Sequence, residues 1–202
     1  MYTQPSRNAA KVPLLNRFFI FFALLSALTV INCSKSAPVT VQPADAVAEL
    51  SFSFTRQSGS ASNQFAVWIE DAQGRYVKTL YAARYTANGG WKRRESSIPQ
   101  WVKQSGLADM NKAQVDALTG ATPGAGTLTY RWDGTDSRNT AVPPGDYVIR
   151  LEGTLRWENQ VLYSAPIRLG QGAAAPEASA EYTGNPGAER GMISNVTVRT
   201  LR

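Results

Sequence analysis

The side chains that most often perform chemistry in proteins are scarce in this 202-residue sequence. It contains no histidine and one cysteine, Cys33. Without histidine the chain lacks the usual general base near neutral pH, the histidine-containing triads and the commonest zinc ligand. The carboxylates form no convincing catalytic pair. The sequence therefore predicts neither a catalytic residue nor a metal site, and it gives a hydrolase little support.

One segment does resemble a known chemical motif. Asp116-Ala117-Leu118-Thr119-Gly120-Ala121-Thr122 is similar to the Asp-x-x-[Ser/Thr]-Gly-Ala-Thr motif of flavinylated domains in bacterial redox complexes. In those domains an exported FMN transferase links FMN through its phosphate to the hydroxyl of the last threonine. The resemblance implies Thr122 as the acceptor. It also implies that Thr119, Gly120 and Ala121 belong to the cofactor-binding loop, with Asp116 as a recognition or orienting residue.

The residue types around Thr122 suit such a reaction. A threonine hydroxyl is a poor nucleophile unaided, so an external enzyme must activate it and approach it closely. Gly120 and Ala121 leave room for that approach, and the Pro-Gly-Ala-Gly run at 123–126 keeps the chain out of a helix or a central strand. Many flavinylated domains carry another Ser or Thr after the acceptor, where this chain has Pro123. The alternative is a plain connector that leads into the next strand.

Three tryptophans and a basic run flank this segment. Trp91, Trp101 and Trp132 have faces on which a flavin ring can stack, although tryptophans in β-sandwiches more often belong to the core. The run Lys92-Arg93-Arg94 has the charge to meet a phosphate or an acidic partner. A short basic run is more often a solvated loop.

Two wider resemblances concern the fold. Trp132-Asp133-Gly134-Thr135-Asp136 with 142–147 (Val-Pro-Pro-Gly-Asp-Tyr) resembles the immunoglobulin-like repeat of flagellar hook-capping proteins. This is a pattern of tight turns, in which we expect the aspartates to bond nearby backbone amides. Over 65–169 the chain looks like the domain-of-unknown-function 2271 family of predicted bacterial periplasmic proteins. The further blocks that carry this likeness are 67–71 (Val-Trp-Ile-Glu-Asp), 74–80 (Gly-Arg-Tyr-Val-Lys-Thr-Leu), 98–101 (Ile-Pro-Gln-Trp) and 115–123. That family implies a periplasmic location and no particular activity.

The elements that must position the motif are mostly strands. Apolar residues alternate with polar ones at 50–55, 65–69, 147–155 and 193–201, and 75–81 and 127–132 are also strand-like. Residues 157–169 read as two short strands, 170–187 as a loop, and 96–118 as a short helical excursion. We therefore expect a mainly β fold, an immunoglobulin-like antiparallel β-sandwich of about seven to eight strands with a short helical insertion.

The N-terminus predicts export. Arg7, Lys11 and Arg17 precede an uncharged apolar run at 18–31, shorter than the roughly 20 residues of a membrane-spanning helix. The run ends at Cys33 in Val-Ile-Asn-Cys, which resembles a lipobox and implies a lipid on that cysteine. Cleavage after Ser36, which discards Cys33, is the alternative. We thus divide the chain into a signal peptide at 1–33, a tether at 34–46 and one domain at 47–202.

The net charge and the predicted location restrict the classes of function that the sequence supports. The formal net charge of +6 includes three basic residues of the signal, and removing them leaves 18 basic and 15 acidic residues, a balance of +3. This bias is too weak to predict nucleic-acid binding. The leading hypothesis is a periplasmic or outer-envelope electron carrier that bears covalent FMN on the Thr122 loop, with an FMN transferase and membrane redox proteins as partners. The alternative is a non-catalytic immunoglobulin-like binding or structural module.

Overall fold

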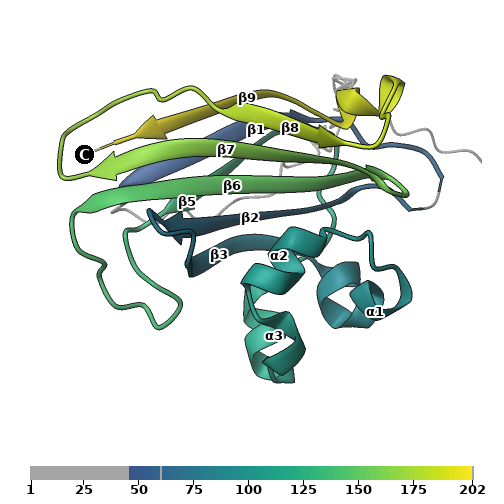
Figure 1. Cartoon of the computed structure of the whole chain (residues 1–202), viewed down its shortest axis with the longest axis horizontal. Coiled ribbons are helices and arrows are strands. Elements are labelled where there is room, and N and C mark those ends of the chain that lie inside the picture. The colour runs from purple at the N-terminus through teal and green to yellow at the C-terminus, as the bar shows by residue number, and fades with distance from the viewer. Residues whose placement is uncertain (1–45, 60, 202) are drawn as a thin grey trace, which may run out of the picture. The chain divides into compact units, whose positions relative to one another are not determined.

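The computed structural model describes residues 46–59 and 61–201, which form two packed β-sheets with a helical insertion. The three-stranded sheet has the order β5-β1-β9 and the six-stranded sheet the order β4-β3-β2-β6-β7-β8 (Figure 1). The predicted signal peptide, the lipid on Cys33 and most of the tether lie outside the described residues. The strands are β1 (Ala48–Phe54), β2 (Gln64–Asp71), β3 (Tyr76–Ala83), β4 (Thr119–Gly120), β5 (Gly126–Trp132), β6 (Gly145–Arg156), β7 (Asn159–Leu169), β8 (Ser179–Thr183) and β9 (Ile193–Thr200).

The main core lies between the two sheets and follows from the alternation of strand residues. Leu50, Phe52 and Phe54 of β1 are buried in it, while Ser51 on the opposite face exchanges a hydrogen bond of 2.7 Å with Thr129 of β5. Successive strand side chains point to opposite faces, so an apolar residue at every second position is enough to give each sheet an apolar inner face. The prediction of a mainly β sandwich is confirmed.

A second, smaller core covers the other face of the six-stranded sheet. It is formed by the helical insertion between β3 and β4, whose segments are η1 (Thr86–Gly90), α1 (Trp91–Arg93), α2 (Pro99–Gln104), η2 (Leu107–Asp109) and α3 (Lys112–Leu118). Trp101 of α2 is fully buried against Trp68 of β2, and its indole donates a hydrogen bond of 2.9 Å to Thr79 of β3. Figure 1 shows these helices grouped beside the β3 side of the sheet. The insertion is longer than the predicted short excursion.

Two segments differ from the prediction. Residues 157–169 are not two short strands, because β6 runs to Arg156 and turns at Trp157 into the single strand β7. The expected loop at 170–187 contains β8, which pairs antiparallel with β7. Four of the five β8 residues are exposed, so no buried face produced the alternation that marks a strand.

The turn-rich connection between β5 and β6 is held by aspartates, as the sequence predicted. Asp133 accepts hydrogen bonds from the amide and hydroxyl of Thr135 and forms an ion pair of 3.2 Å with Lys78 of β3. Asp136 accepts from the amides of Arg138 and Thr140. The hydroxyl of Tyr147 donates to the carbonyl of Pro143 at 2.8 Å. These aspartates hold the turns of the connection.

Candidate functional site

The Thr119–Thr122 segment begins on the edge of the six-stranded sheet. Helix α3 ends at Leu118, and the next two residues pair in parallel with the last two of β3, Thr119 with Ala82 and Gly120 with Ala83. This is the one parallel pair among the strands of the described residues. The sheet edge thus fixes where the loop after Gly120 leaves the domain.

Tyr81 of β3 contacts the start of this loop and anchors it. A side chain at Gly120 would place its Cβ 2.7 Å from Cε2 of the Tyr81 ring, a distance that real contacts do not tolerate. The Tyr81 hydroxyl donates a hydrogen bond of 3.2 Å to the carbonyl of Ala121. Burial raises the pKa of Tyr81 to about 12, although nearby Arg84 opposes the shift. Tyr81 therefore stays a neutral donor at every physiological pH.

The anchor rests on a layer of stacked aromatic rings in the main core. The ring of Tyr81 stacks on Phe65 with centroids 4.7 Å apart and lies 5.2 Å from Tyr130. Phe65 in turn contacts Phe52 and Phe54 at 5.4 and 5.3 Å. Aromatic pairs at these separations add to the burial of their surfaces. The start of the loop is consequently held against the main core.

The structure separates the predicted motif into two parts. Thr119, Gly120, Ala121 and Thr122 lie together beside Tyr81, and Thr122 is half-buried. Neither threonine hydroxyl makes a hydrogen bond to the described residues. Asp116 instead lies on α3, where its exposed carboxylate pairs with Lys112 at 2.7 Å. No hydrogen bond joins Asp116 to the described loop, so an orienting role finds no support in its contacts.

The expectation for Gly120 needs a correction in its physical reason. The sequence suggested that its missing side chain leaves room for a modifying enzyme. The space beside Gly120 is filled by the ring of Tyr81, so the glycine serves the packing of the loop on its anchor. The neighbouring Ala121 is exposed, and this residue and Thr122 present the accessible part of the motif.

Two of the three flanking tryptophans are structural. Trp101 and Trp132 are fully buried, and each indole donates a hydrogen bond, to Thr79 Oγ1 and to the carbonyl of Thr135 respectively. Trp91 is partly buried against the smaller core. The core interpretation of Trp101 and Trp132 is therefore correct, and neither presents a face for stacking a ligand.

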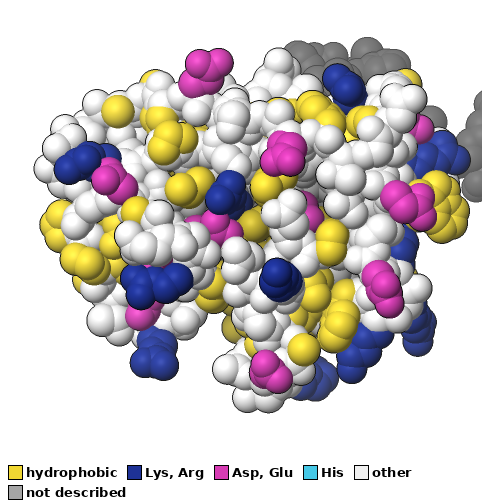
Figure 2. Space-filling view, in the orientation of Figure 1, with side chains coloured by type: hydrophobic (Ala, Val, Ile, Leu, Met, Phe, Trp, Pro, Cys, Tyr) yellow, Lys and Arg dark blue, Asp and Glu magenta, His cyan; other side chains and the backbone are white. Residues whose placement is uncertain are grey.

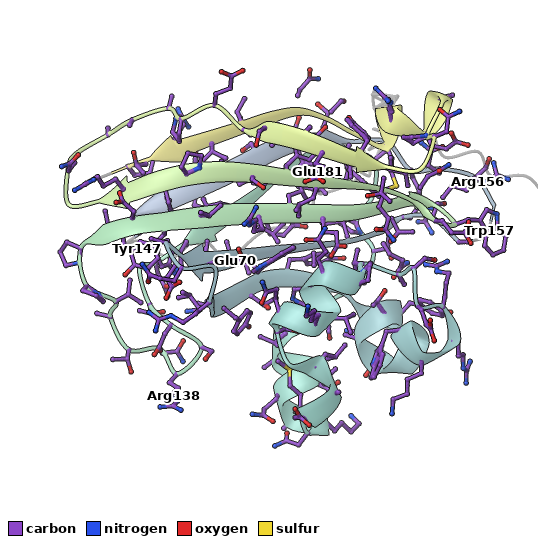
Figure 3. All side chains as sticks on the ribbon, viewed as in Figure 1. Glu70, Arg138, Tyr147, Arg156, Trp157 and Glu181 are labelled. Atoms are coloured by element: carbon purple, nitrogen blue, oxygen red, sulfur yellow. The ribbon has the colours of Figure 1, made fainter. Side chains whose placement is uncertain are left out.

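Other aromatic residues, which sequence reasoning missed, are exposed at the same end of the sheet. Tyr85 is 47% exposed and Trp157 is 53% exposed, and both line a pocket of about 500 Å³ with Arg93 and Arg94. The basic run at 92–94 was the only signal of this pocket in the sequence. Trp157 lies at the β6–β7 turn, where Figure 3 shows it at the end of the hairpin beside Arg156.

A buried carboxylate supports the helical insertion. Glu152 of β6 is 1% exposed and accepts hydrogen bonds from the amides of Gln100 and Trp101 in the first turn of α2, at 3.1 and 2.8 Å. Burial raises its pKa to about 7, because the two amide hydrogen bonds only partly offset the loss of solvent. Within the described residues no group of three potential metal ligands is found, and no helix is long and apolar enough to cross a membrane.

The fold and the site together define a β-sandwich domain with a helical insertion and a small-residue loop at one sheet edge. Residues 47–185 match the family model described as "Predicted periplasmic protein (DUF2271)". The chain belongs to this family, whose predicted location supports export. No curated protein and no solved structure matches the chain.

Proposed function

We propose that this protein is an electron-carrying accessory protein of the cell envelope, with FMN attached covalently to Thr122. The most direct support comes from the position of Thr122. It lies on a loop whose start is anchored, and its hydroxyl makes no hydrogen bond to the described residues. Tyr81 fixes the carbonyl of Ala121, while Thr122 makes no hydrogen bond to the described residues. Modification at this hydroxyl therefore breaks no hydrogen bond of the described fold.

The attachment requires a transferase and an activated flavin donor. The bond forms between Oγ1 of Thr122 and the phosphorus of FMN. The diphosphate bond of a flavin dinucleotide breaks, the nucleoside monophosphate leaves, and the hydroxyl proton passes to the transferase. The domain contributes the acceptor and its position, and the flavin supplies the electron transfer. A covalent bond suits a protein outside the cytoplasm, where a freely dissociating cofactor is lost.

The test is co-expression of the exported domain with an FMN transferase. We expect a yellow protein whose FMN remains after denaturation. Thr122→Ala should lose the flavin completely, and Thr119→Ala is the matched control because it removes the neighbouring hydroxyl from the same segment. A colourless parent protein, or equal labelling of Thr122→Ala, contradicts the proposal.

A second candidate, a non-catalytic binding module, is favoured by a different observation. A cleft of about 660 Å³ lies between the β2–β3 hairpin and the β5–β6 connection, and Arg75, Asp136 and Arg138 are among its lining residues. Figure 3 shows Arg138 at the outer tip of this connection. Exposed charges around an open cleft suit a polar protein partner. Loss of partner capture from envelope extracts on Arg138→Glu, with flavin content unchanged, would support this function.

We also propose that Cys33 carries a lipid that anchors the domain to a membrane. Cys33→Ser should release the protein into the soluble periplasmic fraction, and an unchanged membrane fraction contradicts the anchor.

A further inference from the structure

The pocket lined by Tyr85, Arg94 and Trp157 has features that the fold itself does not explain. The described residues expose three large hydrophobic side chains, namely Tyr85, Trp157 and Leu201, and two of them line this one cavity of about 500 Å³. A volume of that size is typical of small-ligand sites. Two exposed aromatic rings on one cavity provide faces for a flat ligand.

Arg94, which lines the pocket, carries an unsatisfied hydrogen-bond donor. Its Nε is shielded from solvent and has no hydrogen-bond partner within residues 46–59 and 61–201. Buried polar atoms without a partner are rare in folded proteins, because the lost hydration is not replaced. Burial also lowers the pKa of Arg94. A hydrogen-bond acceptor that enters the pocket and reaches this nitrogen would supply the missing partner.

The fold holds the Arg94 guanidinium in place from the other side. Nη2 of Arg94 donates to Ser97 at 3.1 Å, Ser97 exchanges a hydrogen bond of 2.6 Å with Thr86, and Thr86 donates to Gln64 at 3.1 Å. Thr86 and Ser97 are fully buried. The guanidinium also lies 5.4 Å from the centroid of the Tyr85 ring, a cation–π contact. Arg94 is thus positioned before any ligand arrives.

Tyr85 and Trp157 are positioned by unusual backbone. A Cβ on Gly90 would lie 2.3 Å from the carbonyl oxygen of Tyr85 and 2.6 Å from its ring, so only glycine lets Tyr85 occupy this place. Trp157 has a left-handed φ of 50°, and its amide donates to the carbonyl of Ala61, which is left-handed as well at 65°. A bulky residue in this conformation is strained. Such strain concentrates at binding sites.

The lining of the pocket is basic. Among the described residues, Arg93 and Arg94 are its only charged lining residues, and the acidic neighbours Glu95 and Glu158 lie outside the lining. On the face shown in Figure 2, Lys and Arg side chains gather over the helical insertion, toward the end of the sheet where Figure 3 places Trp157. The pocket therefore suits a ring with an electron-rich, hydrogen-bond-accepting edge.

The register of β3 and β4 relates one pocket residue, Tyr85, to Thr122. Ala83 pairs with Gly120, and Tyr85 and Thr122 each follow two residues later from the same end of the sheet. Two extended residues span at most about 7 Å. Arg84, between Ala83 and Tyr85, acts on the pKa of Tyr81, whose hydroxyl holds Ala121. Tyr85 and Thr122 therefore leave the sheet from one paired position, each within about 7 Å of it.

We infer that the Tyr85–Arg94–Trp157 pocket binds a flat heteroaromatic ring between its aromatic side chains, with the accepting edge of the ring toward Arg94, and that this ring is a flavin. The inference rests on the proposed function for the source of the ring, which is the FMN attached to Thr122. A free flavin presents the same ring without the tether. The two sources are separated by experiment.

The first arm tests the pocket without the tether. Thr122→Ala protein is titrated with riboflavin, which has the ring but no phosphate, and the induced circular dichroism of the flavin band is followed. We expect saturable binding that weakens at least tenfold in Trp157→Gly and in Arg94→Gln. Arg168→Gln, an exposed residue of β7 at the opposite end of the sheet, is the matched control and should bind like the parent. Absent binding, or equal binding by both pocket variants, overturns the inference.

The second arm tests the tethered ring in the protein co-expressed with a transferase. Trp157→Gly and Arg94→Gln should retain the FMN mass on Thr122 and lose the induced dichroism of the linked flavin. Retained dichroism in both variants overturns the inference while leaving the proposed function intact. If no FMN mass is found on Thr122, the proposed function fails, and riboflavin binding in the first arm alone decides whether the pocket takes a free flavin.

Discussion

The two ends of the six-stranded sheet differ in whether their environment favours or disfavours the charged forms of their side chains. At the β2–β3 hairpin end, hydrogen bonds outweigh burial and lower the pKa of Asp133, and amide hydrogen bonds from Thr140 and Arg138 lower that of Asp136. At the end with Thr122, burial raises the pKa of Glu152 and lowers that of Arg94, so both charged forms are disfavoured. The first end uses its charges to hold turns, whereas the second leaves one buried donor, Nε of Arg94, without a partner among the described residues.

The largest expected effect lies at the hairpin end. Trp132→Ala removes a fully buried ring that packs on Tyr147 and donates to the carbonyl of Thr135. Loss of a buried tryptophan costs about 3–5 kcal/mol. We expect the free energy of unfolding, measured by urea denaturation, to fall by that amount. A change below about 1 kcal/mol would show that this end is not the structural end of the sandwich.

The next effect concerns the ionisation of Glu152. Burial raises its pKa in the folded state from the usual 4.5 to about 7, so the folded protein binds the extra proton between these values. The stabilisation is complete below about pH 4.5 and is lost as the pH rises through 7, on the order of 1–3 kcal/mol. Urea denaturation from pH 5 to 8 should show this fall.

Glu152→Gln separates this group from all others that titrate. A neutral amide has no ionisation, so the variant should show a flatter stability profile between pH 5 and 8 than the parent. Its overall stability also reflects the hydrogen bond that the amide nitrogen fails to accept from Gln100 or Trp101. An equally steep profile in the variant would assign the pH dependence to another residue.

The smallest effect has the opposite sign. Trp157→Gly places glycine at a left-handed φ of 50°, where an L side chain is strained, and we expect a gain on the order of 1 kcal/mol or less. The substitution removes little buried surface, because the Trp157 ring is largely exposed. Thermal unfolding with Leu201→Ala as the control for an exposed apolar side chain measures it. A loss above about 1 kcal/mol would make Trp157 a structural residue and remove the contrast between the two ends.

Sequence alone predicted the parts of the fold that depend on alternation. Leu50, Phe52 and Phe54 face the main core, and Asp133 and Asp136 hold turns, because side-chain period and turn chemistry are local properties. The exposed strand β8 has no buried face and so left no such signal.

The sequence predicted only one part of the candidate site. The segment at 119–122 was found by its motif, but its parallel pairing with β3 and the packing of Gly120 on Tyr81 join residues far apart in the chain. The pocket unites Tyr85 and Arg94 with Trp157 from a distant hairpin. The sequence also did not predict the left-handed backbone conformation of Trp157, because tertiary contacts set that conformation.

The most direct test of the account is the mass of one peptide. Trypsin cleavage after Lys112 and Arg131 gives residues 113–131, which contain both Thr119 and Thr122. For the protein exported together with an FMN transferase, we predict that this peptide gains the mass of one FMN less one water, and that fragmentation assigns it to Thr122. An unmodified peptide, or FMN assigned to Thr119 alone, would contradict the account.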